Sequence, residues 1–421
     1  MDFSQRIWDL AAEAEAALSP HFARIDQIAF NNTQKIMDAF REHRVGMTMF
    51  DSTSGYGYDD RGRDTLDAIW ADVMDAEAAF VRHQIVNGTQ ALTIGLFGLL
   101  RPGDVMLSVA GKPYDTLEEV IGITGKHGDG SLADFGVRYD QVELTEKGEF
   151  DFDAIAQKLS EYGSAVKVVF VQRSKGYLNR KTLCCAQIGE LVRFVKQKCD
   201  AYVVVDNCYG EFTEEKEPTA YGADMIIGSL IKNPGGGMAE TGGYIAGTAR
   251  AVELASYRLT SPGVGCEVGA TMGQNKSLYK GLFYAPHTTA QALKTAHLAA
   301  YIFGKRGLGF DVEPEWNEKR YDIIQSVITH SPDGLCAICR GIQAGSPVDA
   351  FVTPEPWEMP GYSDKVIMAA GAFTQGSSIE LSADGPLREP YTAYLQGGLT
   401  YESGKIGILS AANEVILSLN K

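Results

Sequence analysis

The sequence lacks the features of a membrane protein or an exported protein. No apolar run approaches the roughly 20 residues that span a bilayer. No basic segment followed by an apolar one opens the chain, so a signal peptide is not expected. Apolar residues such as Ile7, Leu10 and Leu18 instead fall on one helical stripe. Seven cysteines, an odd number without an export signal, indicate reduced thiols and a cytoplasmic location.

Basic side chains are also scarce relative to acidic ones. The chain has 38 Lys and Arg against 54 Asp and Glu, which gives a formal net charge of −16. A negative field of this size repels nucleic acid and anionic lipid, so the sequence predicts no nucleic-acid partner and no membrane partner. Small anions are not excluded, because one local pocket can capture them.

What the sequence does contain is an alternation of short apolar segments and amphipathic helices. A hydrophobic fraction of 45% over 421 residues favours two or three domains with a large core. Between residues 64 and 247 the alternation predicts an α/β fold with a mainly parallel sheet covered on both faces. The expected strands lie at 80–86, 105–110, 166–172, 202–206, 223–229 and 243–246.

The chain is expected to fall into three parts. Residues 1–50 form an N-terminal helical arm, and residues 51–285 form the large domain. Residues 286–421 form a linking helix and a smaller α+β domain. Because proline interrupts helices, we place a hinge near Pro286.

A lysine follows one of the buried strands and leads into a glycine-rich loop. Lys232 comes three residues after Ser229 and is followed by Gly235, Gly236 and Gly237. At the carboxyl end of a parallel strand, its amine would face the crevice where open α/β sheets bind ligands. It can serve there as a phosphate-binding cation or as a nucleophile that forms an imine. Alone, it is better explained as an exposed lysine beside a flexible loop.

A carboxylate at the end of the preceding strand strengthens the case for a cofactor. Asp206 closes the segment 201–206, 26 residues before Lys232. Such an aspartate is often only a turn or helix-capping residue. However, pyridoxal phosphate needs a lysine to hold its aldehyde and a carboxylate to keep its ring nitrogen protonated.

A phosphate cradle is predicted where the first expected strand turns into an apolar helix. Residues 86–91 read Val-Asn-Gly-Thr-Gln-Ala, so free backbone amides and the helix dipole converge near Gly88 and Thr89. The hydroxyl of Ser229 can reach the same phosphate. The three elements occur in the order that one cofactor requires.

With these residues in view, the sequence resembles fold-type-I pyridoxal-phosphate enzymes of the cysteine and methionine metabolism group. It is most similar to the aluminium-resistance or methionine γ-lyase-like subfamily, which is related to cystathionine lyases. The motifs that carry the resemblance are Gly57-Tyr58, residues 87–92, 100–104, 114–116, 205–207 and 229–237, and the run 382–391. The resemblance implies the seven-stranded sheet of the aspartate-aminotransferase-like fold and a homotetramer, a dimer of dimers with shared active sites.

The resemblance also implies a role for each matching residue. Lys232 would hold the cofactor aldehyde, Asp206 would pair with the ring nitrogen, and Tyr114 would stack on the ring and polarise the leaving group. Gly88, Thr89, Gln90 and Ser229 would contact the cofactor, and Arg173 would contact its phenolic oxygen or the substrate. Tyr58 and Arg61 would contact the phosphate of a neighbouring subunit, and Arg388 and Tyr58 the substrate. Relatives carry an arginine two residues after the tyrosine, whereas here Asp59 and Asp60 intervene before Arg61 and Arg63.

The implied reaction is an α,β- or α,γ-elimination on a sulfur amino acid of the cystathionine, cysteine or methionine class. Two alternatives remain open. The same cofactor can support γ-replacement, aldol cleavage or transamination, and a cofactor-binding protein can act in stress resistance without turnover. No metal site is expected, because Cys336 and Cys339 have the spacing of only half a zinc site and fit buried thiols in a strand better.

Overall fold

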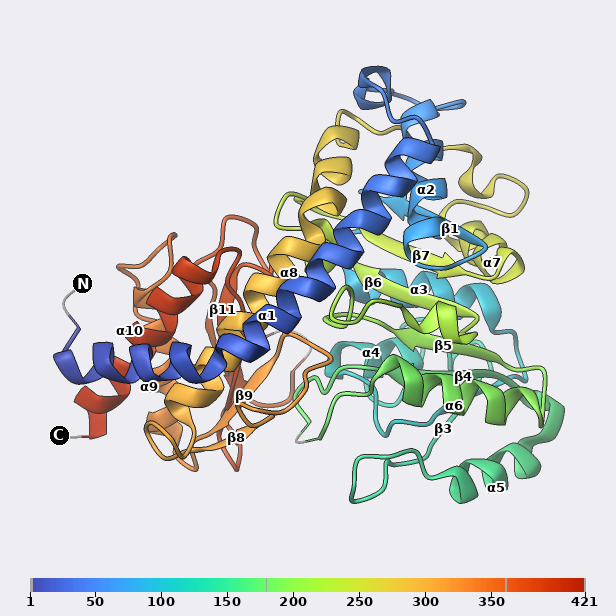
Figure 1. The fold of residues 1–421 in the computed structure, drawn as a ribbon. Helices are drawn as coiled ribbons and strands as arrows, with labels where there is room; N and C mark the ends of the chain where they lie inside the picture. The colour runs from blue at the N-terminus through green and yellow to red at the C-terminus, as the bar shows by residue number, and fades with distance from the viewer. Residues whose placement is uncertain (1–2, 179, 360–361, 420–421) are drawn as a thin grey trace.

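The structure is a computed structural model that describes residues 3–178, 180–359 and 362–419. Two sheets form the cores of two domains, and the long helices α1 (Gln5–Glu42) and α8 (Asn275–Phe303) run together past both (Figure 1). Among the described residues, no helix is both long and apolar enough to cross a membrane.

The large domain is built on a seven-stranded, mainly parallel sheet, as predicted. Its strand order is β1-β7-β6-β5-β4-β2-β3, and only the pairs of β7 with β1 and with β6 are antiparallel. Its strands are β1 (Ala78–Arg82), β2 (Val105–Ser108), β3 (Arg138–Gln141), β4 (Val166–Gln172), β5 (Tyr202–Asp206), β6 (Met225–Ser229) and β7 (Gly243–Gly247). Its other helices are α2 (Arg61–Val73), α3 (Gly88–Leu99), α4 (Asp115–Ile121), α5 (Phe152–Tyr162), α6 (Cys185–Lys196) and α7 (Ala249–Leu259).

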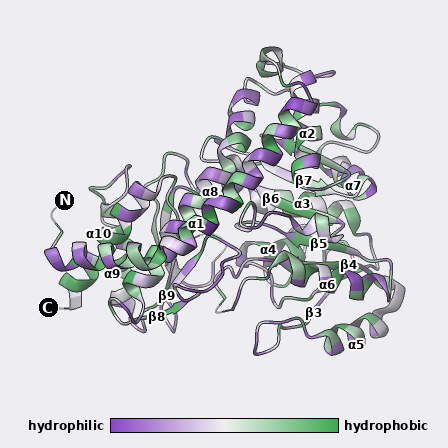
Figure 2. Cartoon of the chain, viewed as in Figure 1, coloured by the Kyte–Doolittle hydropathy of each residue, from purple (hydrophilic) through white to green (hydrophobic). Residues whose placement is uncertain are grey.

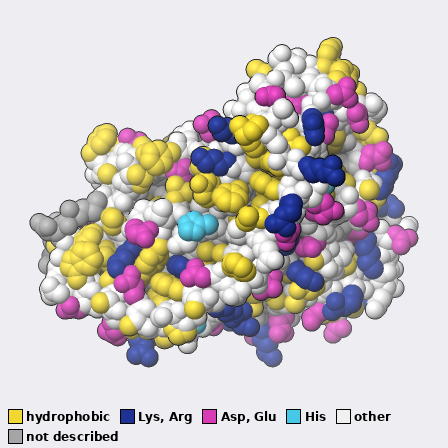
Figure 3. Space-filling model, turned by 45° about the horizontal axis from the view of Figure 1, so that its top comes forward, with side chains coloured by type: hydrophobic (Ala, Val, Ile, Leu, Met, Phe, Trp, Pro, Cys, Tyr) yellow, Lys and Arg dark blue, Asp and Glu magenta, His cyan; other side chains and the backbone are white. Residues whose placement is uncertain are grey.

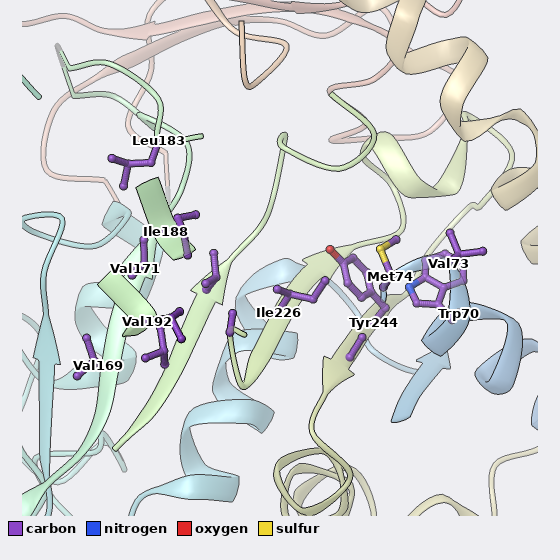
Figure 4. Packing of buried hydrophobic residues seen from close by; sticks show 14 of the residues in the cluster. Trp70, Val73, Met74, Val169, Val171, Leu183, Ile188, Val192, Ile226 and Tyr244 are labelled. Carbon is purple, nitrogen blue, oxygen red and sulfur yellow. The ribbon is translucent and has the colours of Figure 1, made fainter. Parts of the chain in front are cut away.

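Helices cover both faces of this sheet, because its strands carry apolar side chains on both sides. On one face, strand residues such as Val171 and Ile226 pack against α6 and against Trp70 of α2 (Figure 4). On the other face, Phe170 and Ile227 pack against α3 and α7. In Figure 2 the hydrophobic colour accordingly gathers on the central strands, and polar residues lie toward the outside.

The small domain contains a five-stranded antiparallel sheet with the order β10-β11-β12-β9-β8. Its elements are β8 (Asp311–Glu313), β9 (Gln325–Ile328), α9 (Pro332–Ala344), β10 (Val366–Ala369), β11 (Leu381–Pro386), β12 (Thr392–Gly397) and α10 (Tyr401–Leu419). The first turns of α1, with Ile7 and Leu18, pack into the core of this domain. Cys336 and Cys339 are buried thiols on α9, so the strand expected at these residues is wrong.

The helix around Pro286 corrects the predicted hinge. Helix α8 begins at Asn275 and continues through Pro286 to Phe303, so the expected boundary at 285/286 falls inside a continuous helix. A proline inside a helix loses one backbone hydrogen bond. Pro286 is buried at this point, where α8 packs against the glycine loop after Lys232. The structure thus has no break at Pro286.

The first strand and one edge strand also differ from the prediction. Helix α2 ends at Val73, and strand β1 occupies Ala78–Arg82 rather than 80–86. Strand β3, at the edge of the sheet, was not predicted, because Arg138–Gln141 is polar and lacks an apolar pattern.

Candidate active site

The predicted lysine, aspartate and helix start open onto one cavity between the two domains. Strands β5 and β6 are parallel neighbours, so Asp206, the last residue of β5, and Ser229, the last of β6, lie at the same sheet edge. Lys232 follows Ser229, and Gly88 begins α3 at this edge. All four residues line the cavity.

Lys232 is half-buried, and its amine is surrounded by groups that favour its charged form. Its Nζ lies 4.0 Å from the centre of the Tyr209 ring. Burial alone would lower the pKa of Lys232. The neighbouring Cys208, Tyr209, Asp206 and Glu211 outweigh this effect and hold the pKa above its ordinary value. The amine is therefore an ammonium until a ligand engages it.

Asp206 is buried close to this amine. Its Oδ1 accepts a hydrogen bond from the backbone N–H of Cys208 at 3.1 Å. Burial raises the pKa of Asp206, while the positive charge of Lys232 acts in the opposite direction. A buried carboxylate that lines a cavity can hold a proton on a ligand nitrogen.

The start of α3 forms an anion cradle. The side chain of Asn87 caps the helix by accepting from the N–H of Gln90 at 2.8 Å. Gly88 leaves the space beside Ser229 open. A Cβ at this position would fill that space, 3.4 Å from the Cβ of Ser229. The Ser229 hydroxyl is buried and has no hydrogen-bond partner, and the Thr89 hydroxyl is 2.8 Å from that of Thr116. A phosphate fits this combination of helix start and free hydroxyl.

Three tyrosines form one wall of the cavity. The Tyr114 hydroxyl is 2.9 Å from that of Tyr362, and the ring centres of Tyr114 and Tyr177 are 5.7 Å apart. Burial raises the pKa of Tyr114 well above its ordinary value, so its phenol keeps its proton. Tyr114 is thus placed in the cavity as a hydrogen-bond donor.

Gln90 does not line the cavity. Its side chain turns back to accept from the N–H of Val86 at 2.6 Å, and its own N–H is taken by Asn87. The residue is exposed. These hydrogen bonds serve the start of α3, and a contact of Gln90 with the cofactor stays a prediction.

Arg173 is likewise not a cavity residue. Its guanidinium is fully buried behind the site and donates to Asn207 at 2.7 Å, to Glu214 at 2.7 Å and to Glu217 at 3.3 Å. These acidic partners hold the pKa of Arg173 above its ordinary value. The charge of Arg173 is thus balanced within the protein interior, and its contact with a cofactor oxygen stays a prediction.

Arg388 also lies outside the cavity. It follows strand β11, and its guanidinium donates to Asp364 at 2.9 Å. Both side chains of this ion pair are about 40% exposed, and a contact of Arg388 with a substrate carboxylate stays a prediction.

Tyr58 and Arg61 lie away from the cavity of their own chain. Tyr58 is 60% exposed and stacks on Tyr56. Arg61 opens helix α2 and is also exposed. The buried Arg63 holds the turn between them, because it donates to the carbonyl oxygen of Gly57 at 2.6 Å. A contact of Tyr58 and Arg61 with a neighbouring subunit stays a prediction.

Several cavity residues were not found in the sequence. Polar atoms without a hydrogen-bond partner lie on four of them, Gln172, Ser378, Asp384 and Gln396. Ser382 and Asp384 are two residues apart on β11 and so share one face of the strand. This spacing could have identified both residues as cavity residues, but only if the strand were known to face the large domain. Unpartnered buried polar atoms indicate a site built for a polar ligand.

The whole chain is similar to known proteins. The family model described as methionine gamma-lyase matches residues 7–416. The uncharacterized protein YnbB of Bacillus subtilis (strain 168) is 50% identical over 407 residues, which are 96% of each chain. The structure of a carbon-sulfur lyase involved in aluminum resistance from Clostridium novyi NT is 50% identical. It superposes with a TM-score of 0.93 over 100% of this chain and 97% of that one.

A more distant structure shows the same fold. The pyridoxal-5'-phosphate-dependent protein YhfS of Escherichia coli is 17% identical and superposes with a TM-score of 0.62. The match covers 94% of this chain and 97% of that one. The fold predicted from the sequence, a large mainly parallel sheet domain with a smaller domain, is therefore confirmed.

Proposed function

The chain belongs to the methionine gamma-lyase family, and from this premise we propose that it is a pyridoxal-phosphate-dependent carbon–sulfur lyase acting on a sulfur amino acid. The observation that carries the proposal is the placement of Lys232 and Asp206 on neighbouring strand ends, in one cavity with the start of α3. The name of the Clostridium novyi relative, a carbon-sulfur lyase, supports the same reaction class.

The cavity residues fit this cofactor. Gly88, Thr89 and Ser229 would hold its phosphate, Asp206 its ring nitrogen and Lys232 its aldehyde carbon. Bound pyridoxal phosphate supplies a carbonyl that captures amines and a ring that accepts electrons from the substrate Cα.

Three residues of the protein would then each remove, hold or donate one proton. The Lys232 amine removes the proton from the substrate Cα. The Asp206 carboxylate keeps a proton on the ring nitrogen, where electron density accumulates. The Tyr114 phenol donates its proton to the departing sulfur as the carbon–sulfur bond breaks and its electron pair moves to sulfur. The products are a thiol and, after hydrolysis, a 2-oxo acid and ammonia. Cysteine and cystathionine meet these requirements because their sulfur is on Cβ. Methionine carries its sulfur on Cγ and needs one further step, removal of a Cβ proton, before the carbon–sulfur bond can break.

A product panel tests the proposal. Purified protein incubated with cysteine, cystathionine, methionine or threonine is assayed for thiol and 2-oxo acid, and its cofactor absorbance is recorded. We expect thiol and 2-oxo acid in equal amounts from at least one sulfur substrate. Lys232→Ala should abolish both the turnover and the visible band while the protein remains folded. Aldehyde from threonine alone, amino-group transfer alone, or no reaction at all would each refute the proposal.

We also propose that the active site is shared between subunits of a dimer of dimers. The segment that carries Tyr56 and Tyr58 exposes two phenol rings stacked at 5.7 Å. Backbone hydrogen bonds tie this segment to a loop with the exposed Met272. Figure 3 shows apolar side chains exposed among the charges on one face of the chain. Clustered exposed apolar groups are typical of subunit contacts.

A further inference from the structure

One carboxylate in the cavity has no role in the steps above. Asp384 lies on β11 of the small domain and is only 9% exposed. Its Oδ1 is buried without a hydrogen-bond partner. Among the described residues it has no basic group within ion-pair distance, although Lys232 influences it electrostatically. The Tyr177 hydroxyl donates a hydrogen bond to this carboxylate, but no cation in the described part of the chain pairs with it. A buried carboxylate without a cationic partner is costly, so its presence in a ligand cavity calls for one.

The surroundings of Asp384 match a positively charged partner. It faces the wall formed by Tyr114, Tyr177 and Tyr362, whose ring centres are 5.7 to 6.5 Å apart. Aromatic rings and phenol oxygens both attract cations. On the adjacent strands, Met368 is paired with Asp384 and Gln396 with Ser382, and all four residues line the cavity.

The cavity offers little to a negatively charged end group at this position. Lys232 is the single basic residue among the described residues that line it, and the proposed reaction uses that amine. Arg173 and Arg388 are held elsewhere by acidic partners. A second carboxylate on the ligand would therefore meet Asp384 without a compensating cation.

We propose that Asp384 forms a subsite for an ammonium group at the far end of the substrate side chain, beyond the sulfur. The inference deepens the proposed function by naming the substrate class, a cysteine thioether whose departing part is cationic. The position of the sulfur rests on that function, whereas binding of the distal ammonium can be measured without turnover.

A pair of amino acids without a carbon–sulfur bond tests the subsite. Lysine carries a distal ammonium, and 2-aminoheptanoate has a methyl group in the same place. Calorimetric titration of the holoenzyme above pH 7, where the Asp384 carboxyl is charged, should show tighter binding of lysine. Asp384→Asn keeps the shape and removes the charge, so it should weaken lysine binding about ten- to a hundred-fold and change 2-aminoheptanoate binding by about two-fold or less.

Asp311→Asn serves as the matched control, because this carboxylate is exposed on β8 of the same sheet. It should leave both dissociation constants unchanged. Equal binding of the two ligands to the wild-type protein would overturn the proposal, and this comparison does not depend on the folding of any variant. An equal loss of both ligands in Asp384→Asn would overturn it as well.

Turnover separates this inference from the proposed function. S-(2-aminoethyl)cysteine and S-propylcysteine are isosteric thioethers with a cationic and a neutral departing group. Cleavage of both with equal kcat/KM would refute the subsite and uphold the lyase. Preferred binding of lysine, without cleavage of either thioether or of any sulfur amino acid in the panel above, would uphold the subsite and refute the lyase.

Discussion

The amine of Lys232 lies over the ring of Tyr209, 4.0 Å from its centre. A ring face stabilises an ammonium by about 1–2 kcal/mol when water is excluded. Tyr209→Leu should therefore lower the pKa of the Lys232 amine by about one unit. Only the neutral amine captures an aldehyde, so the pH profile for cofactor uptake by cofactor-free protein should move to lower pH. Tyr209→Phe keeps the ring and should keep the profile; a shift of equal size in both variants would argue against the ring.

Asp206 is expected to be essential for turnover and less important for retention of the cofactor. The phosphate contacts proposed for Gly88, Thr89 and Ser229 do not involve this carboxylate. Asp206→Ala should thus retain part of the cofactor, measured by absorbance, and lose about 10³-fold in kcat, as when a preorganised electrostatic partner is removed. Asp206→Glu restores the charge and should recover part of the loss. Near-normal turnover in Asp206→Ala would contradict its assigned role.

The sharing of active sites can be tested by mixing inactive chains. If Tyr58 serves the neighbouring site, co-expressed Lys232→Ala and Tyr58→Ala chains form hybrids in which one site keeps both residues. Random pairing should then restore about a quarter of the wild-type activity. Tyr114 and Lys232 line the same cavity of one chain. A mixture of Lys232→Ala with Tyr114→Phe should therefore stay inactive, and activity there would invalidate the interpretation.

The buried Asp384 should make stability depend on pH. Burial raises its pKa from 3.8 to about 7, so between these values the folded chain keeps a proton that the unfolded chain releases. Stability contributed by this group is full below the lower value and is lost as pH rises through the higher one. Asp384→Asn should therefore gain stability relative to the wild-type protein as pH rises, on the order of a few kcal/mol. Urea unfolding of the cofactor-free proteins on both sides of this window measures the gain; a constant difference would contradict it.

The central features of the site were predictable because they depend on local patterns. Asp206 and Lys232 each follow a run of buried apolar residues, and parallel strand ends meet at one sheet edge. The arginines were not predictable in the same way. Arg173 pairs with Glu214, which is 41 residues away in the sequence, and Arg388 pairs with Asp364, which is 24 residues away. Whether a guanidinium is free for a ligand depends on such distant partners.

The burial of Asp384 between the two domains was not predicted, because it too depends on contacts between distant parts of the chain. Asp384 is polar in a strand that reads as half-exposed, and it becomes buried only where the small sheet covers the large domain. Pro286 illustrates the opposite error. Its residue type favours a helix end, but the packing of α8 against its neighbours maintains the helix on both sides of it.

The unbroken course of α8 has a practical consequence for protein engineering. At Gly281 the helix lies against the backbone of Gly235 and Gly236, in the loop that follows Lys232, and its later turns belong to the core of the small domain. In a chimera joined at residue 285, the two halves of α8 would come from different proteins, and the loop after Lys232 would be misplaced. Junctions before Asn275 or after Phe303 would keep α8 intact. We expect that the small domains of related proteins can be exchanged at these junctions without loss of cofactor chemistry.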